Sequence, residues 1–237
     1  MNRRTARLAL TAASLAVAGA ACGGGSSGGG TTAPQGAKAL VGTFHLTPGS
    51  CKGSGTPTGS YFRMIDANGS LANGPYFQNP DSVCTDKSYS PELPGTDGGL
   101  VTGTFQPPPA KAFDAHGNSL ADRITKPGTF TAIEFGIQTE QVDPQSHIKV
   151  PAPQIFDNDG KLSGQLEAWS ASWNNQYFNQ GSPKPGGTSP GITSPVTGTY
   201  NAATGAFVLT WTSSIVGGPF NGFSGYWHLQ GHFTPSS

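Results

Sequence analysis

The chain has 237 residues, which is enough for one sizeable domain. It carries 13 Lys and Arg against 13 Asp and Glu, and charged residues make up only 11% of it, so it lacks the clustered basic charge that nucleic-acid-binding surfaces need. The 35 glycines and 20 prolines interrupt the chain too often for long helices.

The first 22 residues have the features of an export signal. Three arginines precede an apolar run over residues 8–18, whose 11 residues suit a signal-peptide core and are too few to span a bilayer. The small residues 19–21 and Cys22 follow, a pattern that resembles the lipobox of bacterial lipoproteins, in which the cysteine is lipid-modified and becomes the N-terminus. This resemblance implies that residues 1–21 are a signal peptide and that Cys22 anchors an exported protein to the outer face of the cell membrane.

An alternative to lipidation follows from one departure. Gly19 stands where the lipobox usually has an aliphatic residue. Ordinary cleavage after Ala20 would instead release a soluble, secreted protein.

A tether is expected next. Residues 22–38 are rich in Gly and Ser and have almost no side chain that can bury area, so they are predicted to form a flexible link to a single domain over residues 39–237. Removal of Arg3, Arg4 and Arg7 with the leader leaves 10 of the 13 basic residues against 13 acidic ones, a net charge of −3. Lipid on Cys22 is therefore the expected membrane contact, and nucleic acid is not expected as a partner.

The remaining cysteines form an even pair. With Cys22 lipidated, Cys51 and Cys84 are predicted to form a disulfide in the oxidising compartment that an exported protein reaches. Neither belongs to the CxxC type of cluster that holds structural zinc, so no metal site is predicted from them.

The domain shows the alternation of half-buried strands. Apolar side chains at 207, 209, 211 and 215 face away from polar ones, and those at 223, 227, 229 and 233 repeat the pattern. Residues 130–137 alternate in the same way and are predicted as one strand, with Glu134 on its polar side. A Gly-x-aromatic sequence recurs within predicted strands, where glycine marks bends or bulges; it covers residues 42–44, 103–105, 128–130, 198–200 and 231–233.

Four turns share one chemistry, an Asp or Asn followed closely by Gly, which favours tight hairpins. They lie at residues 65–69, 113–117, 156–160 and 201–205. Hairpins join strands to their sequence neighbours, so we predict an all-β fold: an antiparallel meander of about 8–10 strands, closed as a β-barrel or folded as a β-sandwich.

A ligand site is predicted where tryptophans meet an amide-rich loop. If the strand that begins at Leu162 continues to Trp173, then Trp169 and Trp173 share a face, and Asn175 and Tyr177 follow in the loop. Aromatic faces beside amides suit a sugar, whose C–H face stacks on rings while its hydroxyls bond to amides. The alternative is that the tryptophans belong to the core and the amides cap a polar loop.

The same stretch resembles the avidin and streptavidin barrels, which carry Trp-x-x-x-Trp followed by Asn and Tyr. The match extends to residues 42–50 and 207–211, and the resemblance implies a barrel whose pocket contains Ser50, Trp169 and Trp211. Val196 and Phe233 replace the tryptophan and the aspartate that this family has in its pocket, so a ligand-sized interior is implied rather than binding of biotin.

Other chemistry finds less support. His228 and His232 lie about 13 Å apart along a strand, too far for one zinc ion, although His45 can approach one of them if the first and last strands pair. Glu134 and Glu167 can serve as paired carboxylates of a glycoside hydrolase only if the fold brings them together. No metal, cofactor or catalytic residue is predicted. A non-catalytic envelope binding module for a glycan or small ligand is expected, with a structural or protein-interaction protein and a glycoside hydrolase as alternatives.

Overall fold

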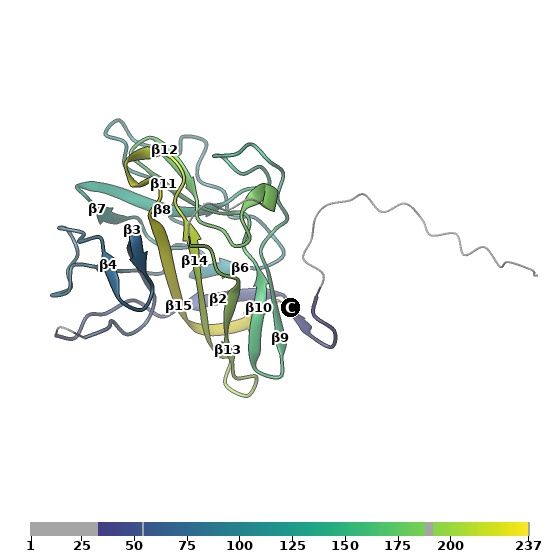
Figure 1. Ribbon diagram of the computed structural model, residues 1–237. Coiled ribbons are helices and arrows are strands. Elements are labelled where there is room, and N and C mark those ends of the chain that lie inside the picture. Colours follow the sequence, from purple (N-terminus) through teal and green to yellow (C-terminus); the bar gives the residue numbers. More distant parts are fainter. Residues whose placement is uncertain (1–32, 54, 188–191, 237) are drawn as a thin grey trace, which may run out of the picture.

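The computed structural model of the protein describes residues 33–53, 55–187 and 192–236, and its regular structure is almost entirely antiparallel β-sheet (Figure 1). The predicted signal peptide, Cys22 and most of the predicted tether lie outside these residues. The all-β prediction is confirmed. Within the described part, no helix is long and apolar enough to span a membrane.

The larger sheet has 11 strands and runs in the order β1-β9-β10-β13-β14-β15-β2-β6, with β3 paired to β15 and with β4 and β5 paired to β3. Its strands are β1 (Lys38–Leu40), β2 (Gly42–Leu46), β3 (Tyr61–Ser70), β4 (Gly74–Tyr76), β5 (Tyr89–Pro91), β6 (Gly99–Val101), β9 (Gln154–Asn158), β10 (Lys161–Gln165), β13 (Val196–Tyr200), β14 (Ala206–Ser214) and β15 (Ser224–Pro235). Several have only three residues, which is why they outnumber the 8–10 strands expected.

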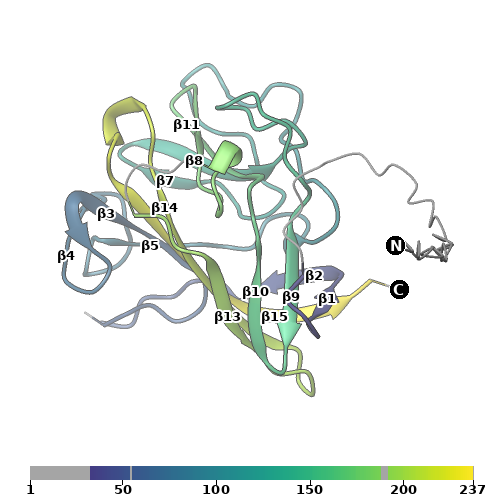
Figure 2. The same ribbon diagram turned by 45° about the vertical axis from the view of Figure 1, so that its right-hand side comes forward.

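A smaller sheet of four strands lies across one end of the larger one (Figures 1 and 2). It consists of β7 (Gly128–Phe130), β8 (Ile133–Thr139), β11 (Trp169–Trp173) and β12 (Gln176–Asn179). Two short 3-10 helices, η1 (Pro185–Gly187) and η2 (Gly218–Phe220), complete the described elements.

Strand β15 organises the larger sheet. One of its edges pairs with β14 along the whole length of that strand, and the other edge pairs first with β3, through residues 224–228, and then with β2, through residues 231–235. Because one strand serves two neighbours in succession, the sheet bends and curls around its inner face (Figure 2). The expected alternation in β14 and β15 is confirmed, since Phe207, Leu209, Trp211, Trp227 and Leu229 are all buried.

Three tryptophans join the two sheets. Trp211 and Trp227 are cross-strand partners in β14 and β15, and their rings stack with centroids 6.0 Å apart. Trp169, from the smaller sheet, packs edge-on against both, at 5.3 and 5.4 Å. Such edge-to-face contacts add stability to the burial of these rings. The hydrophobic core therefore lies between the sheets.

The predicted disulfide between Cys51 and Cys84 is present. It closes a loop over the outer side of β3, where Tyr61 and Tyr89 form a second, smaller apolar cluster with Cys84. Arg63 lies between the rings of Tyr76 and Tyr89, with its guanidinium carbon 3.2 and 4.2 Å from their centroids.

Two local predictions are wrong. Residues 130–137 form a hairpin rather than one strand, because Thr131 and Ala132 take positive φ values of 50° and 66° and connect β7 to β8. Residues 65–69 lie within β3 as an irregularity in its pairing with β4, and the chain reverses over residues 71–73 instead.

The other three predicted turns are confirmed by side-chain bonds to the backbone. Asp114 Oδ1 accepts hydrogen bonds from the amides of His116 and Asn118. Asp157 Oδ1 accepts one from the amide of Gly160, and Asn201 Oδ1 one from the amide of Ala203.

One glycine of the Gly-x-aromatic sequences shows why the residue type is needed. A Cβ atom at Gly231 would lie 1.8 Å from the carbonyl oxygen of His45 in β2, whereas a Cβ atom at Gly128 would meet Phe135 Cε1 at an ordinary 3.6 Å. We expect Gly231→Ala to lower the free energy of unfolding by about 2 kcal/mol or more, because β2 must move away from β15. Gly128→Ala is the control and should change it little. Urea denaturation measures both, and equal effects would contradict this explanation.

Candidate apolar binding pocket

An apolar pocket opens where the smaller sheet meets β3 and β15. Its volume is about 50 Å³. Both sheets and the loop that carries η2 supply its walls, which consist of Phe62, Met64, Phe130, Phe135, Ala171, Trp173, Phe178, Gln180, Ile215, Phe220 and Trp227. None of these side chains is ionisable, so the pocket offers no group for acid–base or nucleophilic chemistry.

The pocket has a buried floor and a partly exposed rim. Gln180 and Trp227 are only 2% and 1% exposed, whereas Ala171 and Phe220 are half-buried. The Phe220 ring lies 5.7 Å from that of Phe130 and 5.5 Å from that of Trp173, between centroids. Phe220 therefore covers part of the entrance.

The loop that carries Phe220 is fixed at several points. The amide of Gly217 donates to Asn221 Oδ1 at 2.8 Å, which closes the loop on itself. Gly218 has a φ of 60° and packs closely on Phe178, because a Cβ atom there would lie 2.8 Å from the ring. The glycines thus allow the loop to bring Phe220 down onto the pocket.

Of the predicted ligand residues, Trp173 lies in this pocket. Its indole Nε1 donates to the carbonyl of Phe130 at 2.8 Å, which fixes the ring as part of the wall. Trp169 and Trp211 are packed in the core, 0% and 1% exposed, and neither lines the pocket. The alternative interpretation, that the tryptophans of this stretch belong to the core, holds for Trp169, and Trp173 is also a buried member of the core cluster.

The other predicted residues lie elsewhere. Asn174 and Asn175 form the exposed two-residue turn of the β11–β12 hairpin, with φ values of 51° and 58°, so the expected amide-rich loop is mostly strand. The Tyr177 ring packs against Phe113, with centroids 5.2 Å apart, and burial raises the pKa of its hydroxyl. Ser50 is exposed and forms a backbone bridge with Thr58.

The reason for this separation is a crossing between sheets. The strand expected from Leu162 to Trp173 ends at Gln165, and residues 166–168 carry the chain from the larger sheet to the smaller one. Leu166 and Ala168 are both fully buried at the crossing. The regular alternation that placed Trp169 and Trp173 on one ligand-facing surface is therefore interrupted.

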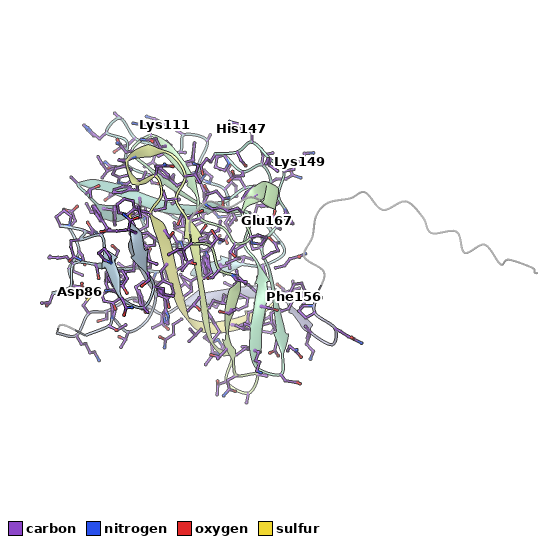
Figure 3. The ribbon with its side chains drawn as sticks, viewed as in Figure 1. Asp86, Lys111, His147, Lys149, Phe156 and Glu167 are labelled. Carbon is purple, nitrogen blue, oxygen red and sulfur yellow. A yellow bond between two sulfur atoms is a disulfide. The ribbon has the colours of Figure 1, made fainter. Side chains whose placement is uncertain are left out.

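The two candidate carboxylates lie far apart. Glu134 is near the start of β8. Glu167, labelled in Figure 3, lies two residues before Trp169, the first residue of β11, and Trp169 pairs with Thr139 at the other end of β8. The five residue-to-residue steps from Glu134 to Thr139 span roughly 17 Å of strand, well beyond the roughly 5–10 Å between paired catalytic carboxylates. Burial raises the pKa of Glu167, but Glu134 is not placed to work with it.

The first and last long strands do pair, and they bring two histidines together. His45 and His232 are cross-strand partners on the exposed face of the sheet. His228 stacks instead on Tyr61, with centroids 4.6 Å apart, and burial lowers its pKa. Among the described residues, no group of three or more His, Cys, Asp and Glu side chains is arranged to hold a metal ion.

Most of the pocket was not predicted from the sequence. Its walls come from segments spread between Phe62 and Trp227, and strand alternation marks such residues only as core. One local feature of the sequence could have indicated the pocket, namely the aromatic residue at the centre of the glycine-rich loop over residues 217–222.

Comparison of the chain with models of protein families, with curated proteins and with solved structures finds no match.

Proposed function

We propose that the protein is an exported, non-catalytic binding module that accommodates a small apolar ligand in the pocket beneath Phe220. We propose further that lipid on Cys22 and the tether over residues 22–38 hold it at the outer face of the cell membrane. The observation that carries the binding proposal is the composition of the pocket: ten apolar side chains and one amide, open to the surface at its rim.

This composition favours an apolar ligand over a glycan. A sugar needs several hydrogen-bond partners for its hydroxyls, and the pocket supplies few polar groups, with Gln180 as its one amide. Of the two tryptophans expected to stack on a sugar, Trp169 lies in the core, and so does Trp211, which the avidin resemblance placed in a pocket. Apolar groups instead gain from leaving water for a site lined with aromatic rings.

Filling the pocket tests the proposal. In the parent chain, benzene should perturb the NMR signals of the Trp173 indole and of the Phe220 amide. In Ala171→Phe, the new ring occupies the entrance, so benzene should leave these signals unchanged. The exported Cys22→Ser chain, which lacks the lipid acceptor, is the parent for both measurements. Ala206→Phe is the matched control, because Ala206 is an exposed strand residue of β14 that does not line this pocket.

Sugars complete the design. N-acetylglucosamine and galactose should leave the same signals unchanged up to millimolar concentration. Perturbation by the sugars but not by benzene would reject an apolar ligand, and insensitivity of benzene binding to Ala171→Phe would place its site elsewhere.

A further inference from the structure

The accessible surface of the apolar pocket contains no polar atom. Gln180 belongs to the wall, but its carbonyl oxygen Oε1 lies against the backbone of β15 at Gly225 and is closed off from the pocket. A hydroxyl or amide placed inside would lose its hydrogen bonds to water and find no replacement, which is costly. Hydrocarbon is therefore the part of a ligand that can lie within the pocket.

The pocket is also too small for a ring while Phe220 covers the entrance. A cavity of about 150 Å³ in another protein holds the six carbons of benzene, which is roughly 25 Å³ for each carbon atom. By this measure, the volume of about 50 Å³ holds about two carbon atoms. The methyl end of an unbranched alkyl chain meets this limit, whereas a ring enters only when Phe220 moves outward.

Apolar side chains continue from the pocket onto the surface. The half-buried rings of Phe77, Phe220 and Phe223 form a phenylalanine rim, in which Phe220 lies 5.1 Å from Phe77 and 6.0 Å from Phe223, between centroids. The segments that carry these rings, residues 67–80 and 213–225, contain no Asp, Glu, Lys, Arg or His. An alkyl chain that leaves the pocket therefore meets further aromatic rings.

We propose that the ligand is an amphiphile with an unbranched alkyl chain, which enters the pocket with its methyl end first. The last carbons of the chain fill the pocket, the next methylenes lie on the phenylalanine rim, and the polar head stays in water. Each methylene that leaves water contributes to binding, whereas the head needs no partner in the protein. This inference rests on the proposed function and specifies its ligand class.

Chain length provides the first test. NMR titration of the exported Cys22→Ser chain with 1-butanol, 1-hexanol and 1-octanol measures binding through the signals of the Trp173 indole and the Phe220 amide. Each added methylene should tighten binding about threefold to fourfold, which corresponds to the transfer of one methylene out of water. Affinities that do not rise with chain length would overturn the inference.

The shape of the ligand provides the second test. Cyclohexanol has the same number of carbons and the same hydroxyl as 1-hexanol, but its ring cannot enter without displacing Phe220. We expect 1-hexanol to bind about tenfold more tightly, because only its chain end gains the burial of about two carbons in the pocket. Cyclohexanol binding as tightly as 1-hexanol would overturn the inference and, where benzene still binds, leave the proposed function standing. Failure of benzene and of every alcohol would reject both.

A variant of the rim locates the rest of the chain. Phe77 does not line the pocket, so Phe77→Ser should weaken binding of 1-octanol about tenfold and leave binding of 1-butanol nearly unchanged. Phe113→Ser is the matched control, because Phe113 is a half-buried ring that contacts Tyr177 instead of the rim. Unchanged affinity of folded Phe77→Ser for 1-octanol would overturn the placement on the rim. If Phe77→Ser does not fold, the comparison of 1-hexanol with cyclohexanol on the parent chain still decides the question.

Discussion

Replacement of Glu92 by Gln should stabilise the protein at pH 8 and change little at pH 5. Glu92 is 2% exposed, and its Oε1 has no hydrogen-bond partner among the described residues. Burial raises the pKa of its carboxyl from 4.5 to about 8, and the nearby Thr125 hydroxyl opposes only part of this effect. The native state therefore holds the neutral acid, which glutamine imitates in shape and charge.

The sign of the pH dependence follows from this raised pKa. Below about pH 4.5 the carboxyl is protonated in both the folded and the unfolded chain, and its full contribution to stability is present. As pH rises from about 4.5 to about 8, the Glu92 carboxyl loses its proton in the unfolded chain more readily than in the folded chain, so the free energy of unfolding decreases. At about 1.4 kcal/mol for each tenfold change in proton affinity, the loss is at most roughly 5 kcal/mol.

Urea denaturation at pH 5 and pH 8 measures the effect, as the difference in free energy of unfolding between the parent chain and Glu92→Gln. Lys184 affects the free energy of unfolding only above the range from pH 5 to pH 8. Burial lowers its pKa from 10.5 to about 8, so its contribution to the free energy of unfolding falls as pH decreases from about 10.5 to 8. Glu134→Gln, which alters an exposed glutamate of β8, is the control. Parallel pH profiles for the parent chain and Glu92→Gln would show that Glu92 is ionised in the native state.

Removal of the disulfide should lower the free energy of unfolding by about 3–4 kcal/mol. Cys51 and Cys84 are 33 residues apart in sequence, and a cross-link across a loop of this length restricts the unfolded chain by about that amount. The double variant Cys51→Ser/Cys84→Ser should show the full loss in urea denaturation. The buried side chain of Cys84 packs with Tyr61 and Tyr89, so part of the effect will come from that cluster.

Reduction of the parent chain provides the matched measurement. Dithiothreitol should lower its stability toward that of the double variant and should leave the double variant itself unchanged. A parent chain that keeps its stability after complete reduction would contradict the prediction.

The fold class could be predicted because burial follows sequence alternation in the first half of β14 and in much of β15, although residues 211–215 are all buried. Trp211 and Trp227 lie on the apolar faces assigned to them, and most of the Asp/Asn–Gly turns were found because their side chains bond locally. The turn at Thr131 and Ala132 could not be found, because a β-branched residue and alanine rarely adopt positive φ. Tertiary contacts impose that conformation.

The candidate site was harder to predict than the fold. Trp173 was identified from its neighbours in sequence, but its companions in the pocket, such as Phe62 and Phe220, are distant along the chain. Alternation shows that a residue faces inward without showing whether space remains beside it. The crossing at residues 166–168 also moved Trp169 from the expected ligand surface into the core.

The position of β15 has a consequence for the order in which the molecule can assemble. Strands β2, β3 and β14 all pair with β15, and residues 224–235 come after every one of them in the chain. While the chain emerges from its N-terminus, the edges of β2, β3 and β14 that face β15 therefore stay unpaired until this late segment arrives. During that interval the open edges are vulnerable to aggregation and proteolysis, so a chaperone would act most usefully there.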